Sequence, residues 1–145
     1  MKNPKHNRDK ILIFNTRDEM TRIRLEQVCF FQSDGNYTKV YFINGVVISV
    51  HTSLVRLQEL IAGVFASSRN AFVRIGKKYI VNSAYIFHIN VLQQRLMLSD
   101  LRSNKVYSLS VGKEALRNLK SFYAPGAMEQ PGTDNISEEN DQSNE

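Results

Sequence analysis

Two glycine-containing turns constrain the fold of this chain most strongly. Asp34-Gly35 and Asn44-Gly45 separate three segments rich in apolar residues: 27–32, 37–43 and 46–51. Glycine adopts positive φ without steric cost, and Asn-Gly favours the primed turn of a two-residue hairpin. Residues 22–25 alternate polar and apolar side chains ahead of these segments. The pattern predicts four consecutive strands in an antiparallel meander.

The spacing of apolar residues changes after residue 51. Apolar residues then recur every three or four positions from 54 to 64, behind Thr52-Ser53. This predicts a capped helix with a core-facing stripe, which Gly63 is expected to end. Further strands are expected over 11–14, 85–89, 96–98 and 105–111. A short helix with one apolar face is expected after Ser110 or Gly112, and the residues of that face are Leu116, Leu119 and Phe122.

Charge divides the chain into three parts. Residues 1–20 form a basic N-terminal arm and the first strand, residues 21–123 form the folded body, and residues 124–145 form a tail with six acidic and no basic residues. The low apolar content of the tail predicts disorder. Residues 1–123 carry 19 basic and 8 acidic residues, a net charge of +11. Such a body favours a polyanionic partner, with nucleic acid ahead of an anionic membrane.

Catalytic, metal and membrane functions find little support in the sequence. Cys29 is the single cysteine, which excludes an internal disulfide, and its apolar neighbours predict a buried thiol. The histidines (His6, His51 and His88) lie far apart and lack metal-ligand spacing. There is no P-loop, no nucleophile elbow and no apolar run near the roughly 18 residues of a membrane span. We expect a cytoplasmic protein without enzymatic activity, metal, cofactor or membrane insertion.

Two polar segments between apolar ones carry the residue types that contact nucleic acids. The segment 72–82, FVRIGKKYIVN, has three cations within five residues: Arg74, Lys77 and Lys78. The segment 33–39, SDGNYTK, offers donors and acceptors after its turn: Asn36, Tyr37, Thr38 and Lys39. Each segment alone is equally consistent with a solvated loop. Together, in a strongly basic body, they predict one nucleic-acid-binding face.

Four segments of the chain follow one another in an order and spacing that are typical of a known domain family. They are FFQSDGNYTKVYF, SLVRLQEL, FVRIGKKYIVNSAYI and SLSVGKEALRNL. In these segments the chain resembles the LytTR-type DNA-binding domain, the output domain of a class of bacterial response regulators, from about residue 21 to residue 123. The resemblance implies a mainly β fold of about ten short strands in three small antiparallel sheets with two short helices. It also implies that loops between strands read double-stranded DNA in successive major grooves.

The resemblance assigns site residues one by one. The implied base contacts fall on three residues: Thr38, Lys77 and Gly112. The implied phosphate contacts fall on Asn36, Tyr37, Lys39, Arg74, Lys78, Ser110 and Lys113. The family often has His-Arg-Ser or His-Asn-Ser in place of Gly76-Lys77-Lys78, and often Arg in place of Gly112. Lys113 could substitute for that Arg only as a point charge. DNA binding is therefore expected to survive, whereas the base preference of the family does not transfer.

We therefore expect a sequence-specific transcriptional regulator of a bacterial cell. Only about twenty residues precede the match, and a receiver domain needs on the order of 120, so we expect a stand-alone domain. Self-association on repeated half-sites and a sensor or regulatory protein partner are further expectations. Two alternatives stay open. One is a protein-interaction module that keeps the fold without specific DNA readout, and the other is a binder of RNA or non-specific nucleic acid that stacks bases on Tyr37 and Tyr79.

Overall fold

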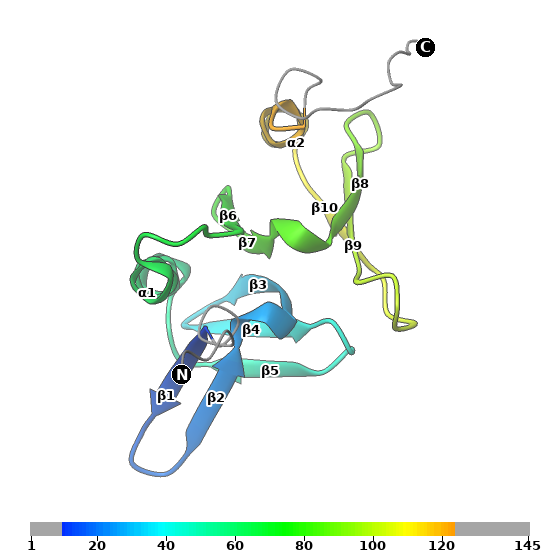
Figure 1. The fold of residues 1–145 in the computed structure, drawn as a ribbon. Helices are drawn as coiled ribbons and strands as arrows, with labels where there is room; N and C mark the ends of the chain where they lie inside the picture. Colours follow the sequence, from blue (N-terminus) through cyan, green and yellow to red (C-terminus); the bar gives the residue numbers. More distant parts are fainter. Residues whose placement is uncertain (1–9, 124–145) are drawn as a thin grey trace, which may run out of the picture.

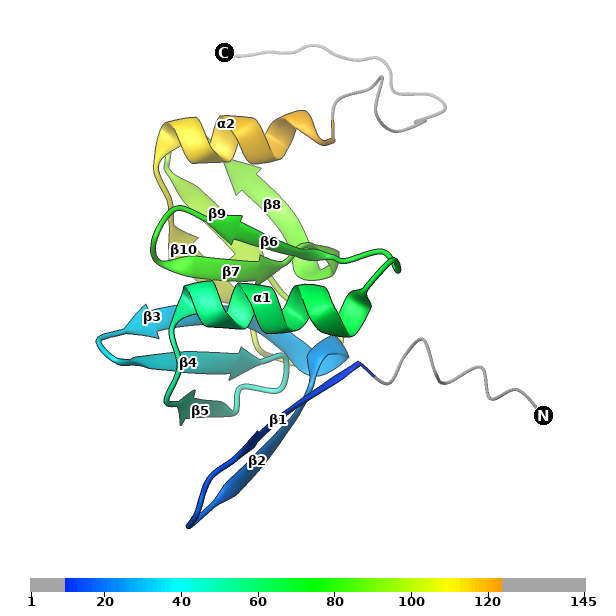
Figure 2. The same cartoon turned by 90° about the vertical axis from the view of Figure 1, so that its left-hand side faces the viewer.

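The computed structural model describes residues 10–123, so most of the basic arm and the whole acidic tail lie outside the described residues. Within this range ten strands form three antiparallel sheets, accompanied by two α-helices (Figure 1). The mainly β fold expected from the sequence is confirmed. One helix lies over the third sheet at one end of the molecule, and a two-stranded hairpin extends at the other end (Figures 1 and 2).

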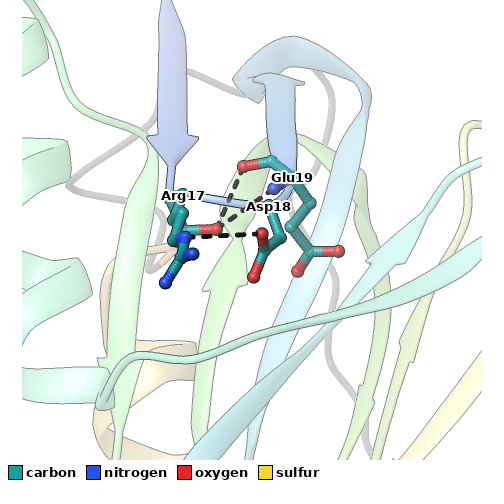
Figure 3. A network of polar contacts seen from close by, with 4 residues as sticks. Arg17, Asp18 and Glu19 are labelled. Carbon is teal, nitrogen blue, oxygen red and sulfur yellow. Dashed lines mark hydrogen bonds and ion pairs between the residues drawn. The ribbon is translucent and has the colours of Figure 1, made fainter.

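The N-terminal hairpin joins β1 (Ile11–Asn15) to β2 (Met20–Arg24). Thr16 closes its turn, because the hydroxyl donates to the Glu19 carbonyl at 3.1 Å and accepts from the Glu19 amide at 3.3 Å (Figure 3). The neighbouring ion pair of Arg17 with Asp18, at 4.0 Å, is fully exposed and adds little stability.

The predicted four-strand meander is wrong at its first strand. The 3₁₀ turn Leu25–Gln27 follows β2 and buries Leu25, which redirects the chain. β2 therefore pairs with β1, and the meander keeps three strands: β3 (Val28–Asp34), β4 (Tyr37–Phe42) and β5 (Val47–Val50).

The five-stranded sheet has the order β5-β4-β3-β7-β6, with β6 at Phe72–Ile75 and β7 at Tyr79–Asn82. β3 is central and carries four consecutive buried residues, Val28 to Phe31. The continuous apolar run arises because cores lie on both faces of this strand. The Asn82 side chain also donates to the Val28 carbonyl at 3.0 Å, which ties the end of β7 to the start of β3.

The two glycine turns differ in detail from the prediction. Gly35, with φ of +62°, and Asn36 form a two-residue loop between the paired residues Asp34 and Tyr37, one position later than expected. The primed turn predicted at Asn44-Gly45 is wrong, since Gly45 alone of the pair has positive φ and its amide donates to the Phe42 carbonyl.

The first helix, α1 (Leu54–Phe65), covers one face of this sheet. The Arg56 amide donates to the Ser53 hydroxyl at 3.1 Å, which confirms the predicted N-cap. Its buried stripe is Leu54, Leu57 and Ile61. The helix continues through Gly63, so the predicted end is wrong; it stops before Ala66, whose φ is +50°.

The third sheet and the second helix cover the other face. The sheet has the order β10-β9-β8, from β8 (Ile86–Asn90), β9 (Arg95–Leu98) and β10 (Tyr107–Ser110). The helix α2 (Lys113–Ser121) buries Leu116 and Leu119 in the same core. Phe122 lies just past the helix and is 67% exposed, so its predicted place on the apolar face is wrong.

Cys29 lies in this core on β3 and is completely buried, as predicted. Burial, reinforced by the negative charge of Asp100, raises the pKa of its thiol to about 12. The thiolate is the reactive form of cysteine, so Cys29 is a structural residue in the folded protein.

Candidate nucleic-acid interface

Three segments that are distant in the sequence meet at one edge of the molecule. They are the β3–β4 turn, the β6–β7 loop and the connection from β10 to α2, which lie on the left of Figure 2. The Ser33 amide donates to the Lys78 carbonyl at 2.9 Å, which joins the first segment to the second. A hollow of about 350 Å³ joins the second to the third, and its lining includes Gly76, Lys77, Lys78, Ser110, Val111 and Gly112.

The basic tip, defined as Gly76–Lys78, is the three-residue loop between the paired residues Ile75 and Tyr79. Gly76 begins it with φ of +60°, a conformation that a residue with a side chain adopts only with strain. Lys77 and Lys78 are both exposed. Tyr79 is only 7% exposed and packs in the core, so it has no free ring face for stacking a base.

Arg74 is half-buried and is held at two points. Its Nε donates to the Gly76 carbonyl at 2.8 Å, and its Nη1 donates to Oε1 of Gln58 on α1 at 3.1 Å. The guanidinium therefore fixes the basic tip relative to α1. A role in positioning the tip fits this geometry better than the phosphate contact expected from the sequence.

The β3–β4 turn presents some of its predicted residues and hides one. Asn36 and Tyr37 are exposed, and Lys39 is half-buried on β4. Thr38 is completely buried, and its hydroxyl donates to the Thr52 carbonyl at 2.8 Å. The expected base contact by Thr38 is therefore corrected: this hydroxyl anchors the segment before α1 to β4.

His51 is a residue of this edge that the sequence analysis missed. It is exposed, and its ring stacks on that of Tyr37 with centroids 4.8 Å apart and planes 28° apart. A signal for it existed, because Thr38 pairs with Val50 in the β4–β5 hairpin, and the same register places Tyr37 opposite His51. The stack adds an exposed aromatic surface beside the turn.

The start of α2 completes the edge. Gly112 is the N-cap and has no side chain to cap the first amides, so the positive end of the helix dipole stays available to an anion. Ser110 and Lys113 are exposed beside it, whereas Glu114 in the first turn opposes an anion. A Cβ added at Gly112 would meet no described heavy atom within 4 Å, so packing does not require glycine there.

The described part of the chain shows neither a metal-ligand cluster nor a membrane-spanning helix. Among residues 10–123, no three His, Cys, Asp or Glu side chains lie together in a way that could hold a metal ion. Neither α1 nor α2 is long and apolar enough to cross a membrane.

The fold and this edge define a class of small β domain that gathers loops and cations at one edge. The family model of the LytTr DNA-binding domain matches residues 18–123, and the chain belongs to this family. LytTR is a family of DNA-binding domains, not of enzymes. No curated protein matches the sequence.

A solved structure has the same fold. It is the LytTr DNA-binding domain of a methyl-accepting/DNA response regulator from Bacillus cereus, and it superposes with a TM-score of 0.56. The match covers 80% of this chain and 98% of that chain, at 15% sequence identity. At this identity the likeness shows the fold alone.

Proposed function

We propose that this protein is a sequence-specific transcriptional regulator that inserts three loops into successive major grooves of double-stranded DNA. The observation that carries the proposal is the meeting of the β3–β4 turn, the basic tip and the start of α2 at one edge. Family membership supports DNA as the polyanion. The major groove of B-DNA is wide enough to admit an α-helix or a two-stranded β-ribbon, and therefore a loop between two strands.

The exposed residues of this edge divide into two roles. Lys77, at the middle of the basic tip, is the proposed base contact. The proposed phosphate contacts are Asn36, Tyr37, Lys39, Lys78, Ser110 and Lys113. Cations at phosphates release condensed counterions and set affinity, while base edges set specificity.

The other predicted site residues act through the loops. Arg74 holds the basic tip in place, and Thr38 anchors the segment before α1 to β4, by the hydrogen bonds described above. Gly76 and Gly112 keep the backbone open to close approach, since each exposes its peptide without a side chain. The backbone amides at these positions can donate to phosphate oxygens.

Selection of genomic fragments by the purified full chain tests this function. The selection is run at about 150 mM salt, where the non-specific electrostatic contribution is largely screened. The expected result is a short recurrent sequence, recovered as repeated half-sites. Recovery of random sequence, with binding that vanishes as salt rises, would contradict the proposal. That result would favour an interaction module that keeps the fold without specific readout.

Arg74→Lys separates positioning from charge. Lysine keeps the positive charge but cannot donate to the Gly76 carbonyl and to Gln58 at once. We expect affinity for the selected site to fall about tenfold, because the basic tip is less well ordered. A tenfold fall corresponds to a loss of roughly 1.4 kcal/mol in binding free energy. The dependence of affinity on salt should stay unchanged. Gln58→Ala, which removes one of the two anchors and no charge, should give a smaller loss in the same filter-binding or fluorescence titration.

Full affinity in Arg74→Lys, together with a large loss in Arg74→Gln, would contradict the positioning role. Arg74 would then act on DNA through its charge.

Thr38→Val tests the corrected role of this buried residue. Valine keeps the shape and removes the hydroxyl, which leaves the Thr52 carbonyl without this donor. We expect the free energy of unfolding in urea to fall by about 1–2 kcal/mol. The base preference of the folded protein should not change. Thr38→Ser, which keeps the hydroxyl, is the matched control for the hydrogen bond. A changed base preference in Thr38→Val would restore the base contact first expected.

The wider assembly is also part of this proposal. Because one domain presents one basic tip, two domains bind a specific operator that contains two repeated half-sites. The protein acts in the cytoplasm. A sensor or regulatory protein would supply the input signal.

A further inference from the structure

The end of β5 lies at the same end of the five-stranded sheet as the basic tip. β5 ends, β4 begins and β3 ends on the left of Figure 2, where the β6–β7 loop also lies. The strand order β5-β4-β3-β7-β6 therefore places His51, which follows β5, in one row with Tyr37 of β4 and Lys78 before β7. Neighbouring strands are about 4.8 Å apart, so His51 continues the proposed DNA-contacting edge by one strand beyond Tyr37.

The backbone on both sides of His51 is fixed. Val50, just before it, is 4% exposed and pairs with Thr38 on β4. Thr52, just after it, donates from its amide to the Val50 carbonyl at 3.0 Å, and its own carbonyl accepts from the buried Thr38 hydroxyl at 2.8 Å. The latter bond joins the residue after Tyr37 to the residue after His51, so it holds the two backbones together where the rings stack.

The stack orients the imidazole of His51 and leaves its nitrogens available. The two rings meet face to face, with centroids 4.8 Å apart and planes 28° apart, so the contact uses a face of the imidazole and not its ring nitrogens. Tyr37 is 48% exposed, and His51 is exposed as well. Within residues 10–123 the His51 nitrogens make no hydrogen bond. An imidazole carries at least one N–H donor in either protonation state, so a held donor faces the solvent here.

The charges near His51 suit an anionic acceptor. Alternate residues of a strand share one face of the sheet, so Lys39 lies on the same face of the hairpin as Tyr37 and His51. Residues 46–53 include no acidic residue. Asp34 pairs with Tyr37 from the other side, on β3, so a full strand separates its carboxylate from His51. The donor of His51 therefore has a cation on its own face and the acid one strand farther away.

We propose that His51 is a fourth contact of this edge with DNA, which donates to a backbone phosphate from a ring held in place by Tyr37 and by the hydrogen bond between Thr38 and Thr52. The inference rests on the proposed function, which uses three loops and gives no role to the segment between β5 and α1. Phosphate oxygens are the same in every sequence, so this contact adds affinity and fixes the register of the protein without reading a base. Because β5 is the edge strand, the contact lies at the outer limit of the row.

His51→Phe in the full chain is the direct test, because phenylalanine keeps an aromatic ring against Tyr37 and removes the N–H donor. We expect affinity for the selected duplex to fall about fivefold, by the same factor for the operator and for its single-base variants. Ethylation of one phosphate that weakens binding of the wild-type chain should no longer weaken binding of His51→Phe. His88→Phe is the matched control, because His88 is an exposed histidine on β8 near the end of α2, and it should change neither result.

A double-mutant cycle with Tyr37→Leu tests the role of the stack. Leucine removes the aromatic support, so His51→Phe should cost less than about twofold in that background. His51→Gln keeps an N–H donor and loses the ring, so its affinity should lie between those of the wild-type chain and His51→Phe. Urea denaturation should show that these exposed-site variants fold as the wild-type chain does.

Full affinity in His51→Phe would overturn the inference, as would an equal loss in His88→Phe. A changed base preference in His51→Phe would overturn the phosphate contact, and full additivity with Tyr37→Leu would overturn the role of the stack. The failure of the proposed function is a separate result. A wild-type chain that binds no duplex would refute the function together with this contact, whereas a chain that binds its operator equally well with His51→Phe would refute the contact alone.

Discussion

Replacement of Lys77 by alanine is expected to weaken binding to the selected operator and to change the preferred base at one position of each half-site. Lys77 is exposed in the middle of the basic tip, whose backbone is fixed by Arg74 and by the pairing of β6 with β7. Loss of one base contact removes about 1–3 kcal/mol, which is roughly 5- to 150-fold in affinity. Titration of the operator and of its single-base variants measures both effects.

Two lysines serve as controls for this experiment. Lys39→Ala removes a proposed phosphate contact, so it should weaken all sequences alike and reduce the slope of log affinity against log salt by about 0.9. Lys105→Ala should change neither affinity nor preference, because Lys105 lies in the loop between β9 and β10, over the ring of Tyr107. If Lys77→Ala and Lys39→Ala both weaken all sequences uniformly, the assignment of base and phosphate roles is wrong.

Phe31→Ala is expected to have the largest effect on stability, a loss of about 3–5 kcal/mol in the free energy of unfolding. Phe31 is completely buried on the central strand β3, between Val40 of β4 and Ile80 of β7. Its ring centroid is 5.9 Å from that of Phe72 on β6. Truncation leaves a cavity where three strands and α1 meet, and those strands carry two of the three proposed DNA-contacting segments.

Urea denaturation of Phe31→Ala beside Phe122→Ala measures this effect. Phe122 is 67% exposed, so its truncation should change the unfolding free energy by less than about 0.5 kcal/mol. A loss below about 1 kcal/mol in Phe31→Ala would show that the core relaxes around the cavity, against the close packing described here. DNA binding by the folded fraction of Phe31→Ala should persist, because the ring does not reach the exposed edge.

The local elements were largely predictable because they depend on short-range pattern. The helical spacing behind Ser53 and the continuous apolar run of β3 both specified their elements correctly. Errors arose where long-range packing overrode a local signal. Gly63 did not end α1, because the hydrophobic stripe continues past it, and residues 22–25 left the meander once Leu25 was buried.

The candidate site was predictable as segments and less so as side chains. Exposed Lys77 and Lys78 follow from their place between two apolar anchors in the sequence. The burial of Thr38 did not follow, because the carbonyl that accepts from it belongs to Thr52, beyond the next strand. The stack of Tyr37 on His51 required the register of the β4–β5 hairpin as well.

The sequence by itself identified the family, through the resemblance of four segments in order and spacing. It also determined the mainly β class and the basic character of the body, because composition, turn residues and apolar spacing are local properties of the chain. The tertiary structure alone decided which distant segments meet. The insertion of β7 beside β3 joins Ser33 to Lys78, and the packing of α2 on the third sheet brings Gly112 to the basic tip. Such contacts depend on which strands pair along their edges and which faces pack together. The pattern of apolar residues along the chain does not specify these pairings, because they are set by the packing of the hydrophobic core.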